Sequence, residues 1–279
     1  MVRLDIPGRY RSIAAAIALC SANAPMPATF QGPGELAVAP TRILLEGKER
    51  AAELVLVNRG RERASYRVSL VDMRMAADGR LERLPASELP SSSAKPHLKY
   101  SPKQVTLDPG ASQRIRIALQ RQADLEPGEY RSHLLFEALP NSSASRSTGD
   151  SNYLTIRFQV VGAVSLPVIA RVGKVFASGE LCEPRIGDDG LWVKLRRTGN
   201  RSIRGDVTAY FEPNGSKSRR RIGAIRELPL YHPNAERLVR VPLEVPPSSL
   251  KGGTIVIQFQ EATGLKDRVR ASTELRVPA

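Results

Sequence analysis

Residues that could carry catalysis or bind a metal are few and scattered along this chain. The three histidines, His97, His133 and His232, lie far apart, and none has a second histidine at the spacing that zinc sites use. His133 alternates with the apolar residues Leu134 and Phe136, which predicts an exposed histidine on a strand. The sequence contains no G-x-S-x-G nucleophile motif and no cluster of cysteine and histidine. An enzyme is therefore the function class that the sequence favours least, and we expect no cofactor and no metal.

Three short motifs that resemble binding sites are better explained as structural features. Gly32–Ala37 matches part of a dinucleotide-binding motif, but the pattern of a strand rather than a helix follows it. Asp188-Asp189-Gly190 offers two carboxylates to calcium, yet the same residues are typical of a hairpin turn. Arg219-Arg220-Arg221 lacks the interleaved aromatic residues that single-stranded nucleic acids stack on, so a solvated hairpin explains it better. We expect no nucleic-acid partner.

The amino-terminal residues have the pattern of an export signal spanning residues 1–24. Arginines precede a short apolar run, Ile13–Cys20, and small residues suited to cleavage follow at Ala22-Asn-Ala24. The run is too short to span a bilayer and no later run reaches that length, so we expect a soluble exported protein without membrane insertion. Cleavage would remove Cys20 and leave Cys182 alone, so no internal disulfide is expected.

The remaining chain is organised as short segments of alternating hydrophobicity separated by turn residues, which predicts an all-β fold. Turns such as Asp108-Pro-Gly110 punctuate the segments, because glycine tolerates positive φ and proline presets its own φ. The pattern indicates two tandem immunoglobulin-like β-sandwich domains, at residues 35–170 and 171–279, with almost no linker. The segments of the first are Leu36–Leu45, Ala51–Asn58, Ser65–Met73, Lys103–Leu107, Arg114–Leu119, Tyr130–Leu139 and Leu154–Leu166. Those of the second are Gly173–Phe176, Leu191–Arg196, Gly205–Phe211, Arg221–Ile225, Arg237–Leu243, Thr254–Gln260 and Val269–Arg276.

One predicted strand, within Leu154–Val168, is unusually long. Most strands stop after about five or six residues, whereas here apolar residues alternate with polar ones over more than twice that length. The apolar face consists of Leu154, Ile156, Phe158, Val160, Val164, Leu166 and Val168. A polar, serine-rich segment precedes it and predicts a mobile loop. From the pattern alone, these apolar residues either fill the core of their own sandwich or serve a partner.

Several segments resemble, in order, the first domain of PapD-like periplasmic pilus chaperones. They are Val38–Leu45 with Ala51–Asn58, then Tyr100–Gly110 with the strand Gln113–Leu119, and then Gly128–Pro140 with the polar loop and Leu154–Val168. The second domain resembles the family only in its size and β character. The resemblance implies a periplasmic protein that binds pilus or fimbrial subunits, with an outer-membrane usher as a further partner.

The resemblance also implies where subunits bind. In that family the seventh strand of the first domain is lent to an incomplete subunit, a role that falls here on Leu154, Ile156 and Phe158, with Val160 next in the series. Two basic residues grip the terminal carboxylate of the subunit, and Arg42 matches the first of them.

The second basic residue, a lysine on the seventh strand, has no match, because Val161-Gly162-Ala163 stands in its place. Arg171 or Lys174 could replace it.

Two other functions are compatible with the sequence. An exported tandem immunoglobulin-like protein acting as an adhesin or scaffold would use the long strand only as structure. A basic cell-envelope protein with the net charge of +14 found here would bind polyanions, with an affinity that falls steeply with salt.

Overall fold

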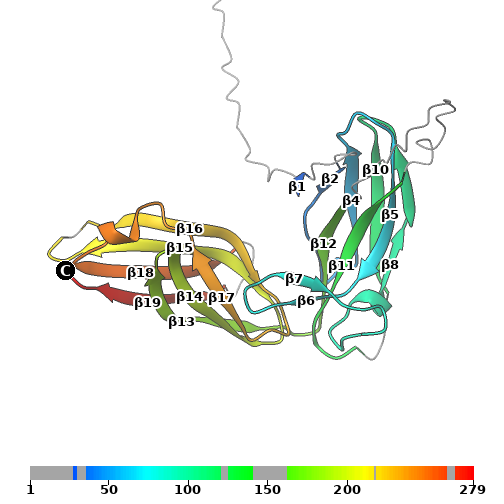
Figure 1. The fold of residues 1–279 in the computed structure, drawn as a ribbon. Coiled ribbons are helices and arrows are strands. Elements are labelled where there is room, and N and C mark those ends of the chain that lie inside the picture. Colours follow the sequence, from blue (N-terminus) through cyan, green and yellow to red (C-terminus); the bar gives the residue numbers. More distant parts are fainter. Residues whose placement is uncertain (1–27, 30–35, 121–124, 141–161, 217, 263–267) are drawn as a thin grey trace, which may run out of the picture.

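The computed structural model describes residues 28–29, 36–120, 125–140, 162–216, 218–262 and 268–279. Within these residues the chain forms two β-sandwiches that meet at an angle, with no α-helix (Figure 1). The all-β prediction of two tandem immunoglobulin-like sandwiches is confirmed, whereas the domain limits 35–170 and 171–279 stay predictions. Among the described residues, no helix has the length and apolar character needed to cross a membrane.

The first sandwich packs two five-stranded sheets around one core. One sheet has the order β1 (Ala28–Thr29), β2 (Leu36–Ala39), β4 (Ala51–Asn58), β10 (Ser112–Leu119), β8 (Leu98–Ser101). The other has the order β3 (Ile43–Glu46), β12 (Ala163–Val172), β11 (Gly128–Leu139), β5 (Ala64–Val71), β9 (Gln104–Leu107). All pairs are antiparallel except β3 with β12. The alternation in β4 and β10 places Leu54, Leu56, Ile115 and Ile117 in the core.

The second sandwich has a three-stranded and a four-stranded sheet. The first is ordered β13 (Ala177–Gly187), β14 (Gly190–Gly199), β17 (Glu236–Val241), and the second is ordered β16 (Arg220–Leu230), β15 (Ile203–Pro213), β18 (Gly253–Glu261), β19 (Arg270–Val277). Between the two sheets lies a second core that includes Leu195, Val207, Ile257 and Phe259. Short 3-10 turns at Lys95–His97 and Pro247–Ser249 complete the regular structure.

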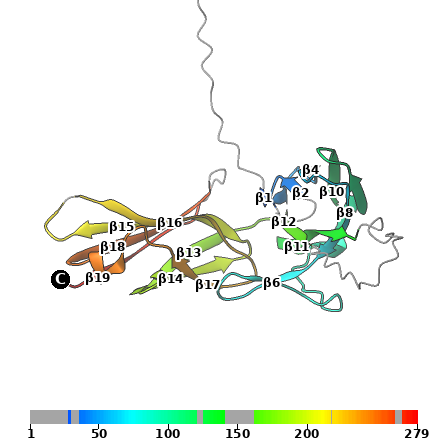
Figure 2. The same cartoon turned by 45° about the horizontal axis from the view of Figure 1, so that its top comes forward.

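A separate two-stranded hairpin, β6 (Met73–Met75) with β7 (Leu81–Arg83), leaves the first sandwich after β5 and lies between the two sandwiches (Figure 2). Strands of three residues are too short to show a period, so alternation in the sequence did not predict this hairpin.

In the second set, the structure shows that one predicted strand is wrong and that one strand was missed. Gly173–Phe176 is a linker without strand structure, because Gly173 turns the chain at φ +63° and packs against Pro127. The strand follows it instead, as β13. A bulge between Cys182 and Arg185, with Glu183 at φ +53°, interrupts the alternation of β13 and explains why the pattern missed it.

Candidate functional site

The strand β12 has one border without a partner over half of its length. It pairs with β11 from Ala163 to Val172, but on its other side β3 pairs only with Val168–Arg171. Among the described strands, none pairs with the outer border of Ala163–Pro167, because β2, which precedes β3, belongs to the opposite sheet. Unpaired N–H and C=O groups on such a border can accept a strand of another chain.

The apolar face of the described part of β12 belongs to its own sandwich. Leu166 and Val168 are 2% and 0% exposed, and Val164 packs against the same core. For these three residues the core-filling interpretation is therefore right. The predicted subunit-binding residues Leu154, Ile156, Phe158 and Val160 lie outside the described residues.

Arg42 lies just before β3, on the side of the first sandwich that faces the second. Leu44 is two residues further on, so it points the same way as Arg42, and it packs against the second core. The Nε of Arg42 is buried and has no hydrogen-bond partner. Burial lowers the pKa of its guanidinium, and the nearby positive charges of Arg204 and Arg171 lower it further, against the opposite influence of Glu129. An anion bound near Arg42 would therefore stabilise the charged form of its guanidinium.

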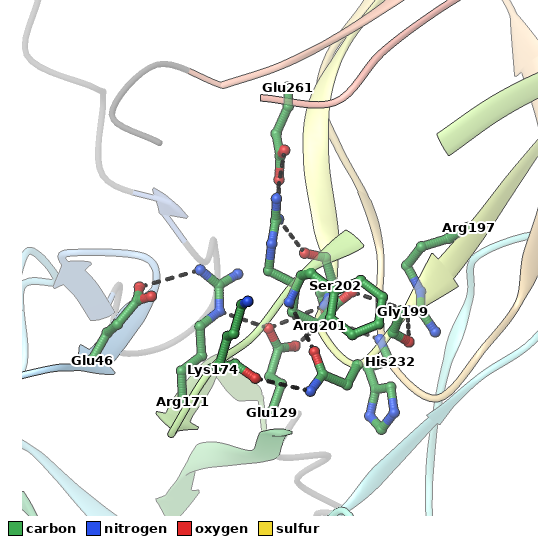
Figure 3. A network of polar contacts seen from close by, with 12 residues as sticks. Glu46, Glu129, Arg171, Lys174, Arg197, Gly199, Arg201, Ser202, His232 and Glu261 are labelled. Atoms are coloured by element: carbon green, nitrogen blue, oxygen red, sulfur yellow. Dashed lines mark hydrogen bonds and ion pairs between the residues drawn. The ribbon is translucent and has the colours of Figure 1, made fainter. Parts of the chain in front are cut away.

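Of Arg171 and Lys174, the two candidates for the second basic residue of the carboxylate anchor, only one lacks an ion pair with a described residue. Arg171 is 5% exposed, and its Nε and Nη1 donate to Glu129 Oε2 (3.0 Å) and Glu46 Oε2 (3.2 Å). Lys174 is exposed in the linker beside Arg171 (Figure 3), and its ammonium group has no ion pair with a described residue. Of the two, Lys174 is the one free to receive a carboxylate.

Glu129 is the centre of a polar network that joins the two sandwiches (Figure 3). Its side chain is almost fully buried and accepts hydrogen bonds from Arg171 of the first sandwich and from the backbone N–H (3.1 Å) and hydroxyl of Ser202 in the second. The backbone of His232 donates in turn to the Ser202 hydroxyl at 2.9 Å. A buried carboxylate with these partners is satisfied only while the sandwiches stay together.

Further arginines hold the loop that carries Ser202. Arg201 and Glu261 form a two-point ion pair, at 2.5 and 3.1 Å, and both are nearly buried. Arg197 donates to the carbonyl groups of Gly199, Arg201 and Asn234. The loop is thereby rigid on the side that receives Glu129.

The prediction of an exposed His133 is wrong, because the side chain is 0% exposed and lies edge-on to the Tyr231 ring, 6.4 Å away. The strand β11 is central in its sheet, and its face opposite the core is covered by the second sandwich. Neither ring nitrogen of His133 has a hydrogen-bond partner. Burial, with a smaller effect of the Arg131 charge, lowers the pKa of His133 from 6.5 to about 3. Alternation within one strand could not reveal a cover supplied by another domain.

The other motifs have the structural roles that the sequence predicted. Asp188-Asp189 forms the β13–β14 turn, and Asp189 accepts a hydrogen bond from the Trp192 indole at 2.9 Å. Arg219, Arg220 and Arg221 are exposed. Cys182 is half-buried on β13.

No protein-family model and no curated protein matches the sequence. Similar solved structures include those of chaperones, at low identity. One is a chaperone–tip adhesin complex of CFA/I fimbriae (14% identity, 88% of this chain and 99% of that chain, TM-score 0.47). Another is the E. coli chaperone DraB (13% identity, 87% of this chain and 97% of that chain, TM-score 0.47). A third is the CsuC–CsuE pre-assembly complex from Csu pili of Acinetobacter baumannii (13% identity, 85% of this chain and 97% of that chain, TM-score 0.45). At identities this low the similarity concerns the fold and assigns no partner.

Proposed function

We propose that this protein is a periplasmic chaperone that caps pilus- or fimbria-type subunits by donating a β-strand before they assemble. The observation that carries the proposal is the unpaired border of β12 at Ala163–Pro167. The alternating apolar residues upstream of this border, from Leu154 to Val160, would extend the strand towards the subunit.

Strand donation satisfies both needs of an incomplete sandwich. Main-chain hydrogen bonds to the border of the donor strand occupy the open edge of the subunit, and alternate apolar side chains fill its groove. Leu154, Ile156, Phe158 and Val160 have the alternation that such a groove requires. In this proposal they differ from Leu166 and Val168, which their own core already uses.

Arg42 would anchor the terminal carboxylate of the subunit between the two sandwiches. A guanidinium can bind a carboxylate through two parallel hydrogen bonds, and the unpartnered Nε of Arg42 supports this role. Lys174 would supply the second positive charge. An outer-membrane usher would receive the loaded chaperone.

The proposal is tested by co-purification with a pilin-type subunit, to be sought among the products of the neighbouring genes. We expect Ile156→Asp to abolish capture of the subunit, because a charge cannot enter an apolar groove. Gln159→Asp is the matched control, since it places the same charge on the polar face, and it should retain capture. Capture by Ile156→Asp would refute strand donation and favour the adhesin or scaffold function.

Arg42→Ala tests the carboxylate anchor separately. The loss of a charge-assisted hydrogen bond worth about 1.5–3 kcal/mol should weaken subunit binding by roughly 10- to 100-fold, with an unchanged melting temperature. Arg59→Ala removes an exposed arginine far from the site and should have no effect on binding. A collapse of the Arg42→Ala fold would instead identify Arg42 as a structural residue.

A further inference from the structure

The β6–β7 hairpin belongs to the first sandwich by sequence, but its strand β6 is packed into the second. Met75 is 2% exposed and is part of the second core. Figures 1 and 2 both show the hairpin extending from β5 towards β17. The covalent connection between the sandwiches, through the linker after β12, is at a different place.

One backbone hydrogen bond attaches the hairpin to β17, and one side-chain hydrogen bond attaches it just before that strand. The N–H of Leu238 donates to the carbonyl of Ala77 at 2.8 Å, and the side-chain amide of Asn234 donates to the carbonyl of Met75 at 2.9 Å. In the described sheet β17 has a partner strand, β14, on one side only. The hairpin therefore contacts, at Leu238, the border of β17 that lies away from β14.

The tip of the hairpin is fitted closely to Arg237. A Cβ added to Gly79, which has φ +90°, would lie 2.1 Å from the guanidinium carbon of Arg237. The guanidinium is itself held, because its Nη1 donates to the carbonyl of Pro229 at 2.6 Å. The tip thus rests on a side chain that the second sandwich keeps in place.

The root of the hairpin is equally fixed, on the side of the first sandwich. Asp72 is buried and accepts hydrogen bonds from the hydroxyl groups of Ser93 (2.8 Å) and Ser132 (2.6 Å), while its carbonyl accepts one from the N–H of Leu84 (2.9 Å). Arg131 Nη2 donates to the carbonyl of Met73 at 3.0 Å. The hairpin is therefore held by hydrogen bonds to both sandwiches, at its root to the first and nearer its tip to the second.

These contacts have a mechanical consequence. Besides the linker, the sandwiches are joined by the network around Glu129 and by the packing of Leu44, Ile169 and His133 against the second sandwich. Rocking of two domains about an interdomain interface is the usual expectation unless that interface is large and hydrophobic. A further attachment at a distance would restrict such rocking.

We propose that the β6–β7 hairpin is an interdomain clamp that fixes the angle between the sandwiches and so the position of Arg42 relative to the second sandwich. Met75, Ala77 and Asn234 are then positioning residues, and the clamp acts whether or not a subunit is bound.

The test measures the distance between the two sandwiches directly, without any partner. Spin labels are placed at the exposed Ser112 and Ser272, after replacement with cysteine, in a chain whose Cys20 and Cys182 are serine. We expect a single narrow distance distribution for the parent chain. The distribution should broaden in the double variant Met75→Ser/Asn234→Ala. It should stay narrow in the single variant Met75→Leu, which keeps an apolar side chain in the second core and keeps Asn234. Leu81→Ser, on the exposed strand β7, is the matched control and should stay narrow.

Trypsin provides a second measurement, because the hairpin carries Arg74, Arg80 and Arg83. An isolated two-stranded hairpin is only marginally stable in water, so release from β17 should raise the cleavage rate within residues 74–83 by about tenfold or more. Asn234→Ala alone changes no residue of either core, so both measurements can be made on this variant if the double variant fails to fold. An unchanged distance distribution with unchanged cleavage in Asn234→Ala and in any folded double variant would overturn the clamp.

Discussion

At the residue scale, the effect of a buried polar side chain on stability depends on whether it has hydrogen-bond partners. Glu129 and His133 lie four residues apart on β11 and are both buried at the domain interface. Glu129 accepts hydrogen bonds from both sandwiches, so its charge is compensated. His133 has no hydrogen bond at either nitrogen, so it is tolerated only in its neutral form.

The neutral state of His133 predicts a pH dependence of stability. The pKa of His133 in the folded protein is about 3, below the ordinary value of 6.5, so the unfolded chain binds the extra proton first as pH falls. The contribution of His133 is complete above about pH 6.5 and decreases below it, by about 2 kcal/mol between roughly pH 7 and pH 5. His133→Leu should remove this part of the decrease. His232 contributes in the same direction, because burial lowers its pKa as well, so a smaller dependence should remain.

Urea unfolding at the two pH values measures the effect. His97→Leu is the matched control, and it should keep the full difference between the two pH values that the parent chain shows. The assignment to His133 would fail if His133→Leu lost as much stability on acidification as the parent chain does.

At the element scale, β12 combines an inward apolar face with an outer border that is only half occupied. Leu166→Ala should lower the free energy of unfolding by about 2–5 kcal/mol, because it opens a cavity in the first core. Ser165→Ala on the exposed face should change it by less than about 0.5 kcal/mol. Ile156→Ala should change the free energy of unfolding as little as Ser165→Ala does, because in the proposed function Ile156 contacts a partner rather than the protein's own core. Denaturant titration of the three purified variants gives the comparison, and a loss for Ile156→Ala equal to that for Leu166→Ala would place Ile156 in the protein's own core.

The strands also differ in how well the sequence predicted them. Regular alternation predicted β4 and β10 well, because their inner faces are covered by one opposing sheet. It located β11 but assigned the wrong exposure to His133, because both faces of β11 are covered. It failed at β13, where a bulge breaks the period, and at Gly173–Phe176, where a glycine turns the chain. The unpaired border of β12 and the attachment of β6 to the second sandwich depend on pairing between distant segments. No local pattern encodes such pairing.

The candidate site was predictable to a similar extent. Arg42 came from a resemblance, whereas its direction towards the second sandwich was found only in the structure, where Leu44 packs against the second core. Arg204 was not predicted, because it lies in the second domain and its nearness to Arg42 exists only in the folded protein. The occupation of Arg171 by two carboxylates was likewise invisible in the sequence.

At the scale of the whole molecule, the net charge of +14 allows a rival account in which binding is electrostatic. Charges on the surface are screened over about 3 Å in roughly 1 M salt, whereas burial of apolar side chains is not weakened by it. We therefore expect a subunit captured on immobilised chaperone to stay bound through a wash with about 1 M sodium chloride. Heparin loaded on the same resin is the control polyanion, and it should be released.

Only the carboxylate anchor, formed by Arg42 with Lys174, should show a salt effect in the subunit complex, and Arg42→Ala should reduce that effect while the complex persists. The reason is that the apolar face of the donated strand, Leu154, Ile156 and Phe158, carries no charge, so its contacts in the groove have no counterions to release. If the affinity for the subunit instead fell linearly with the logarithm of salt concentration, as the affinity for heparin should, charge rather than a shared strand would hold the complex. The unpaired border of β12 would then need another explanation.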